Sequence, residues 1–256
     1  MVGKKTRFLP IIIFSIVFIF SAFNFKQFKE LNNKNTVKSG LKFEKEIMIK
    51  VPEPSGITFN KTNNSLLIVS DESSRIYKLS LDGKIIDSLE VNGFDLEGIT
   101  YINDSTLATI LERERTVVIL TDEGKELSRF DIDLYGKPNS GLEGIAYNSK
   151  NNRLYILNEK SPCLLLVLDL TGNVLSKKEL KIAKDLSGIF IDESKNEIWI
   201  TSHESKSVYQ CKADGTVINY YPIDIPQVEG IAIDFNSKKI FLVCDKTESL
   251  LVYSLP

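Results

Sequence analysis

Apolar residues beyond position 41 occur in short runs that polar turns separate. Residues 66–69 and 154–157, for example, are rich in Leu, Ile and Val, and a polar cluster at 148–152 precedes the second of these runs. The runs have strand length and show no 3.6-residue period, so they predict β-strands rather than amphipathic helices. Asp82 with Gly83, and Asp214 with Gly215, lie between such runs and are typical of tight β-hairpins.

The strands belong to a unit that occurs five times. Each unit begins with a glycine followed by isoleucine, and in three units a glutamate precedes the glycine. The five glycines are Gly56, Gly98, Gly144, Gly188 and Gly230, with spacings of 42, 46, 44 and 42 residues. A unit of this length with four short strands is typical of a propeller blade.

The predicted fold is therefore all-β, a five-bladed β-propeller with four-stranded blades over residues 41–256. The fifth unit reaches Pro256 after its third strand, whereas residues 41–50 precede the first glycine and largely alternate like the other fourth strands. We expect this N-terminal strand to close the last blade, since that pairing joins the ends of the ring and covers a sheet edge.

The region before the propeller has a different pattern. Residues 1–29 are predicted to form an N-terminal membrane anchor or signal segment, because basic residues precede an uncharged apolar run at 8–25. The length of the run and the poor cleavage site favour an uncleaved signal-anchor over a cleaved signal peptide. Residues 30–40 are polar and read as a tether. The expected localisation is the cell membrane, inner or plasma, single-pass, with the propeller on the periplasmic or extracellular side.

Charge and composition exclude several classes of function. The net charge is −2 and the lysines are scattered, so no nucleic-acid partner is expected. Three cysteines at wide spacing form neither a disulfide framework nor a CxxC metal motif. The single histidine, His203, excludes any site that needs two histidine ligands.

The residue before each repeat glycine is the first candidate for chemistry. In a propeller the first strand of each blade lines the central axis, so these residues form a ring: Ser55, Glu97, Glu143, Ser187 and Glu229. Three neighbouring carboxylates require compensation to remain ionised. Ca²⁺, which binds six to eight oxygen ligands, would provide it. The alternative is a metal-free channel mouth in which water screens the charges.

A second polar column follows the second strand of each unit. Its members are Asp71, Glu112, Glu159, His203 and Asp245. The start of the first strand and the end of the second lie on the same face of a propeller, so the two columns are expected to form concentric rings around one funnel. The alternative is a set of solvated turns. His203 is a weak candidate for a general base, and a lone histidine in a polar turn is more often incidental.

The repeated Leu-Glu-Gly-Ile motif, the segment Asp-Leu-Glu-Gly-Ile-Thr-Tyr at 95–101 and Leu-Glu-Arg-Glu-Arg at 111–115 resemble the SdiA-regulated, YjiK-like family. The resemblance covers about residues 41–256. It implies a five-bladed, NHL-like propeller with a bound calcium ion. It also implies Glu97 and Glu143 as ligands, with Glu112, Glu159 and Glu229 as further acidic positions of the motif.

These observations leave three functions open. The first is a membrane-anchored extracytoplasmic propeller with an axial calcium site that binds a small polar ligand or a protein partner at the funnel. The alternative is a calcium-dependent hydrolase of esters, lactones or phosphoesters, in which the metal acts as a Lewis acid. The third is a scaffold whose ion only stabilises the ring. Binding is favoured over catalysis because no complete catalytic constellation is readable.

Overall fold

The computed structural model describes residues 40–60, 64–134, 136 and 140–256. The predicted anchor or signal segment, 1–29, and the tether up to residue 39 lie outside the described residues. Among the residues that are described, no helix has the length and apolar character needed to cross a bilayer.

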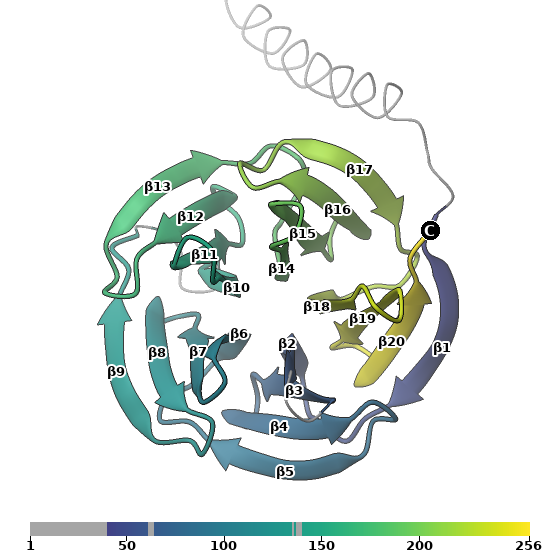
Figure 1. The fold of residues 1–256 in the computed structure, drawn as a ribbon, viewed down its shortest axis with the longest axis horizontal. Coiled ribbons are helices and arrows are strands. Elements are labelled where there is room, and N and C mark those ends of the chain that lie inside the picture. Colours follow the sequence, from purple (N-terminus) through teal and green to yellow (C-terminus); the bar gives the residue numbers. More distant parts are fainter. Residues whose placement is uncertain (1–39, 61–63, 135, 137–139) are drawn as a thin grey trace, which may run out of the picture. The chain divides into compact units, whose positions relative to one another are not determined.

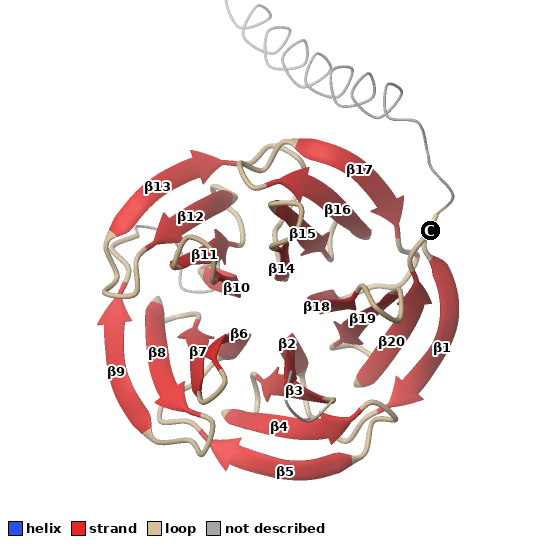
Figure 2. Cartoon of the chain, in the orientation of Figure 1, coloured by secondary structure: helices blue, strands red, loops and turns tan. Residues whose placement is uncertain are grey.

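The described chain forms five antiparallel sheets of four strands each, arranged as blades around a central axis (Figures 1 and 2). Blade one contains β2 (Pro54–Asn60), β3 (Ser65–Ser70), β4 (Arg75–Ser80) and β5 (Ile85–Glu90). Blade two contains β6 (Leu96–Asn103), β7 (Thr106–Leu111), β8 (Thr116–Thr121) and β9 (Glu126–Asp131). Blade three contains β10 (Leu142–Asn148), β11 (Arg153–Asn158), β12 (Leu164–Leu168) and β13 (Val174–Glu179). Blade four contains β14 (Ile189–Asp192), β15 (Glu197–Ser202), β16 (Ser207–Lys212) and β17 (Val217–Pro222).

Blade five is assembled from both ends of the propeller sequence. It contains β18 (Val228–Asp234), β19 (Lys239–Cys244) and β20 (Ser249–Ser254), with β1 (Lys42–Met48) as its outer strand. β1 pairs antiparallel with β20, and the rings of Phe43 and Tyr253 meet edge to face at 5.4 Å across this pair. The predicted closure of the last blade by the N-terminal strand is confirmed.

The repeat glycines lie where neighbouring blades approach each other at the axis. A Cβ on Gly98 would lie 2.6 Å from the carbonyl oxygen of Glu143, and one on Gly230 would lie 2.4 Å from the carbonyl oxygen of Ser55. The same relation holds in every blade, so each glycine faces the backbone of the next blade around the ring. The glycine is therefore required by close approach of two backbones, as expected for a crowded inner strand.

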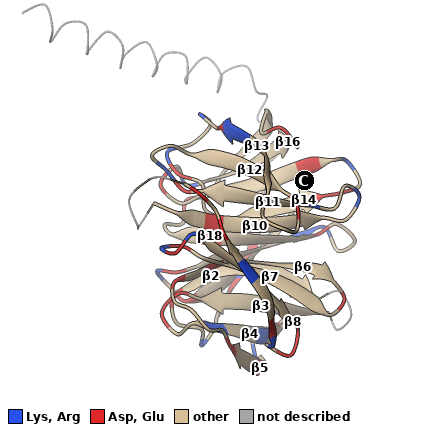
Figure 3. Ribbon diagram, turned by 90° about the vertical axis from the view of Figure 1, so that its left-hand side faces the viewer, with Lys and Arg blue, Asp and Glu red and all other residues tan. Residues whose placement is uncertain are grey.

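The hydrophobic core lies between the blades. Between blades two and three, for example, Ile110 and Val117 pack with Ile145 and Leu154, and all four side chains are buried. Burial of each such side chain contributes about 1.5–3 kcal/mol, so the blade interfaces hold the inner strands in place. Lys, Arg, Asp and Glu lie both in loops and on strands, β13 among them (Figure 3).

Candidate functional site

The inner ring of residues before the repeat glycines surrounds a narrow space on the axis. This axial cavity has a volume of about 10 Å³ and is lined by Ser55, Glu97, Glu143, Ser187 and Glu229 with their following Gly-Ile pairs. A space of this size holds roughly one water-sized occupant. In blades one, two, three and five the pairing between the first and second strands is irregular at this point. Such bulges re-aim side chains, here towards the axis.

A wider cavity of about 280 Å³ opens at the same end of the axis. Four ring residues line it, together with residues of the second column: Ser55, Glu97, Glu143, Glu229, Asp71, His203 and Asp245. Glu53 and Pro54 complete the lining. We call this cavity the acidic mouth. The two polar columns recognised in the sequence therefore share one face of the propeller.

A third polar column, which the sequence analysis missed, supports the second. It lies three residues before each repeat glycine and consists of Glu53, Asp95, Gly141, Asp185 and Gln227. In blades one, two, three and five its backbone carbonyl accepts a hydrogen bond from the amide of the second-column residue, with N–O distances of 2.8–3.1 Å. Asp185 is fully buried, and Asp95 is 5% exposed. The fixed offset from the repeat glycine was the signal that could have revealed these residues.

Two carboxylates of the mouth, Glu97 and Glu143, form a tight group with Glu112 of the second column. Oxygen atoms of Glu97, Glu112 and Glu143 lie within 4.8 Å of one another, and we call these residues the glutamate triad. Burial raises the pKa of Glu97 and of Glu143 well above the usual range, and neighbouring carboxylates raise both further. A hydrogen bond from Ser55 Oγ to the Glu97 carboxylate partly opposes this shift.

Glu112 and Asp71 connect the triad to the third column. Burial raises the pKa of Glu112 to about 7; a hydrogen bond from the Gly141 amide at 2.9 Å opposes the shift, and the Asp95 carboxylate adds to it. Burial and a hydrogen bond with Asp95 raise the pKa of Asp71 to about 7. Oxygens of Asp71, Asp95 and Glu97 also lie within 4.8 Å of one another, so Glu97 belongs to two acidic groups.

Basic residues neutralise the outer acids of this face. The Arg113 Nε lies 2.8 Å from Asp95 Oδ2. Lys160 Nζ lies 2.6 Å from Glu159 Oε1 and 3.0 Å from Glu204 Oε1. Burial raises the pKa of Glu159, and its ion pair with Lys160 limits the rise. Glu159 therefore lies apart from the triad, in a charged group of its own.

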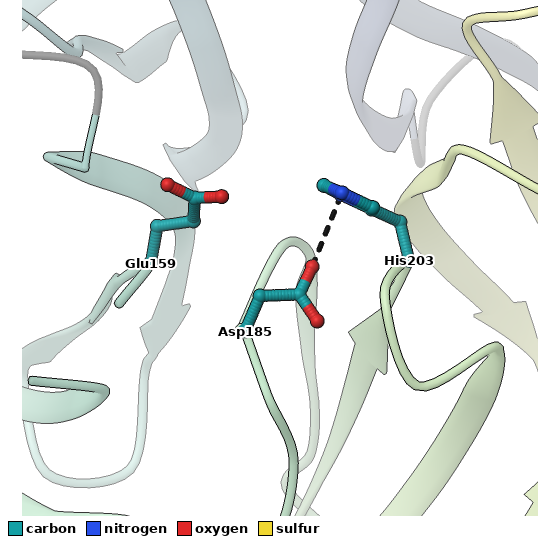
Figure 4. A group of neighbouring side chains, drawn as sticks. All are labelled: Glu159, Asp185 and His203. Atoms are coloured by element: carbon teal, nitrogen blue, oxygen red, sulfur yellow. Dashed lines mark ion pairs between the residues drawn. The ribbon is translucent and has the colours of Figure 1, made fainter. Parts of the chain in front are cut away.

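His203 lies in that second group, beside Asp185 and across from Glu159 (Figure 4). Its Nδ1 is 3.0 Å from Asp185 Oδ2 and 3.4 Å from Glu229 Oε1. The close contact with Glu229, together with the charges of Glu229 and Asp185, raises the pKa of His203 to about 9, although burial opposes the rise. The imidazole is therefore protonated at neutral pH and cannot accept a proton as a general base.

Asp245 completes the second column in blade five. Its Oδ2 accepts a hydrogen bond of 2.9 Å from the side-chain amide of Gln227. Burial raises the pKa of Asp245, and the charges of Glu229 and Glu53 raise it further. The mouth thus combines several buried or half-buried acids. Burial and mutual repulsion both oppose the ionisation of these acids.

Comparison with known proteins identifies the family. A model of the SdiA-regulated family matches residues 34–247, so the chain belongs to this family.

Solved structures share the fold at low sequence identity. A glutaminyl cyclase from Myxococcus xanthus superposes with a TM-score of 0.68 and 14% identity, over 83% of this chain and 95% of that chain. A selenomethionine-substituted virginiamycin B lyase from Staphylococcus aureus gives a TM-score of 0.51 and 19% identity, over 83% and 70%. A streptogramin B lyase gives 0.51 and 17%, over 85% and 74%. At these identities the similarity concerns the fold alone.

Proposed function

We propose that this SdiA-regulated propeller is a calcium-binding module whose acidic mouth presents the bound ion to a small polar ligand or a protein partner. The observation that carries the proposal is the glutamate triad, Glu97, Glu112 and Glu143, with carboxylate oxygens within 4.8 Å of one another. Burial and repulsion disfavour three ionised carboxylates at this distance, and a divalent cation reverses that preference.

The donor set fits a hard cation that prefers oxygen. Besides the triad, the hydroxyl of Ser187, a residue lining the axial cavity, is buried and has no hydrogen-bond partner among the residues that the structure describes. Carboxylate and hydroxyl oxygens suit Ca²⁺, which accepts six to eight ligands in flexible geometry. Zn²⁺ prefers nitrogen and sulfur ligands, and the only histidine of the chain is protonated beside Asp185 and Glu229.

The residues around the proposed ion have different roles. Glu97, Glu112 and Glu143 would hold the ion, and Asp71, Asp95 and Glu229 are further carboxylates near Glu97 and Glu112. The bound ion supplies positive charge that an oxygen atom of a ligand can approach. The protonated His203 lines the same cavity and can donate a hydrogen bond to that ligand.

The geometry favours binding over hydrolysis. The hydrolase alternative needs a general base beside the ion, and the protonated state of His203 removes the candidate that the sequence suggested. The enzymes among the fold neighbours are 14–19% identical to this chain. Propellers of one fold serve unrelated functions, so these neighbours assign no reaction here.

We further propose that residues 8–25 anchor the protein in the membrane, with the propeller on the extracytoplasmic side. The support is the uncharged apolar run and the basic residues before it. Full-length protein should sediment with membranes and withstand a carbonate wash, and deletion of residues 1–29 should leave the protein in the cytosolic supernatant. A full-length protein that the wash releases would contradict the anchor.

Thermal unfolding of the full-length protein after chelation tests the calcium proposal. A ligand that binds only the folded state at 100 times its dissociation constant adds about 2.7 kcal/mol, or about 5–11 °C in the unfolding midpoint of a domain of this size. We expect this rise with Ca²⁺, a smaller one with Mg²⁺, and no rise in Glu97→Gln.

The matched control is Glu123→Gln, an exposed glutamate in the turn between β8 and β9. This variant should keep the full response to Ca²⁺. A wild-type midpoint that millimolar Ca²⁺ leaves unchanged would refute the proposal, and so would an equal response in Glu97→Gln.

A further inference from the structure

The end of the axis opposite the acidic mouth opens into a second, larger cavity of about 690 Å³. The isoleucines that follow the repeat glycines separate it from the axial cavity and line both: Ile57, Ile99, Ile145, Ile189 and Ile231. Binding sites for small molecules usually measure about 300–1,000 Å³ and are mostly apolar with a few polar groups. We call this second cavity the apolar pocket.

The wall of the apolar pocket is aromatic all round and acidic on one side only. Every blade contributes one aromatic side chain: Phe59, Tyr101, Tyr147, Phe190 and Phe235. Blades four and five contribute acidic residues, Asp192 and Asp234 among them, with Glu193 beside Asp192. Among the described residues that line the pocket there is no Lys or Arg. The pocket therefore combines an apolar body with negative charge on one side.

Asp192 is the polar group that points to a ligand. It is 3% exposed. Its Oδ1 accepts hydrogen bonds from the backbone amides of Ser194, at 3.0 Å, and Lys195, at 3.3 Å, and from the Ser194 hydroxyl. Its Oδ2 is buried and accepts no hydrogen bond within the described chain. A buried carboxylate oxygen without a hydrogen bond is costly, so it marks a place for a donor.

The nearest cation is Lys195, whose Nζ lies 3.6 Å from Asp192 Oδ2. The Lys195 side chain is 57% exposed, and its Nζ also lies 5.3 Å from the centroid of the Phe235 ring. An exposed ion pair of this kind contributes little, about 0–1 kcal/mol. It therefore leaves room for a stronger, buried donor at the same oxygen.

We propose that the apolar pocket binds a small organic amine, whose ammonium group donates a hydrogen bond to Asp192 Oδ2 and whose apolar body lies against Phe59, Tyr101 and Tyr147. An ammonium group satisfies the buried oxygen, and aromatic faces attract cations and pack against aryl or alkyl groups. An anionic ligand would meet the repulsion of three carboxylates. A neutral ligand would leave Asp192 with only its exposed ion pair to Lys195.

Calorimetric titration of the full-length protein with three probes of similar size tests this proposal: phenethylammonium, phenethyl alcohol and phenylacetate. A charge-assisted hydrogen bond predicts that the ammonium binds about tenfold or more tightly than the alcohol. Phenylacetate should not bind. Equal affinities for the ammonium and the alcohol, or no binding of the ammonium at millimolar concentration, would overturn the proposal.

Two variants locate the effect. Asp192→Asn keeps the Oδ1 acceptor that caps the turn but removes the charge, so it should abolish the preference for the ammonium. Asp169→Asn is the matched control, because Asp169 caps an exposed turn in the same way through Thr171 and Asn173. It should bind like the wild type. A preference that persists in Asp192→Asn would refute the assignment.

Discussion

Replacing Gly98 by alanine should destabilise the propeller at its axis. The new Cβ would lie 2.6 Å from the carbonyl oxygen of Glu143, and 2.9 Å from both the amide nitrogen and Cγ2 of Ile145. Real Cβ atoms essentially never approach other atoms this closely. Two of the three atoms belong to the backbone of β10, so rotation of one side chain cannot relieve the contact, and blades two and three must move apart.

The expected cost is about 1–3 kcal/mol, as for other overpacked sites. For a domain of this size it corresponds to a fall of about 2–12 °C in the thermal unfolding midpoint. The same displacement moves Glu143 within the glutamate triad, so Gly98→Ala should also respond less to Ca²⁺ than the wild type.

Circular dichroism melts of chelated, full-length protein would measure the effect. Gly40→Ala is the matched control, because a Cβ on Gly40 meets no atom within 4 Å, and it should melt like the wild type. If Gly98→Ala melts together with Gly40→Ala, close approach of the blades does not explain the repeat glycine.

Three further predictions concern the ionisable groups of the mouth. Glu143→Gln removes a carboxylate whose pKa is raised well above the usual range by burial. The metal-free variant should melt at or above the wild-type temperature and should lose the response to Ca²⁺. A clearly lower midpoint of the metal-free variant would contradict this prediction. In the folded protein the pKa values of Glu112 and Asp71 are raised to about 7 from the usual 4.5 and 3.8. These shifts contribute stability that is complete below the unfolded-state pKa and is lost as pH rises through about 7. Chelated protein should therefore melt lower at about pH 8 than at about pH 5, whereas a midpoint that rises with pH would show the opposite sign. His203 is the only histidine, so it gives a single imidazole titration by NMR. The pKa of His203 should be about 9 in the metal-free protein and should fall in Glu229→Gln. A wild-type pKa near 6.5 would refute the assigned contacts.

The sequence was sufficient to predict the architecture because the repeat contains residues with strong local conformational preferences. Glycine before isoleucine marks each inner strand, and Asp82 with Gly83 marks a hairpin between β4 and β5. The alternation at the start of the propeller predicted β1, whose pairing with β20 closes the ring. Each of these features is local, or follows from counting the strands of a repeating unit.

The composition of the site required tertiary structure. The sequence placed Glu112 and Glu159 at equivalent positions of one column, yet Glu112 joins the triad while Glu159 pairs with Lys160. The difference arises from the neighbours of each side chain, which periodicity does not specify. Asp95 and Asp185 escaped notice because a carboxylate in a loop is usually solvated, whereas here both are buried beneath the second column.

The apolar pocket escaped prediction for a related reason. Phe59, Tyr101 and Tyr147 lie on first strands whose alternation reads as ordinary core. Only the arrangement of the blades shows that these side chains, which also pack against the core between the blades, line an open cavity. Asp192, at the end of β14, similarly reads as a turn residue, and its unbonded oxygen is visible only in three dimensions.

The most direct test of the proposed calcium site is a crystal structure of the protein grown with Ca²⁺, with anomalous diffraction data collected at long wavelength. We expect one anomalous peak at the axis, within bonding distance of carboxylate oxygens from Glu97, Glu112 and Glu143, and no such peak in Glu97→Gln crystals grown in the same way. A clear map that shows only water among these three carboxylates, or a calcium peak elsewhere on the propeller, would contradict the account.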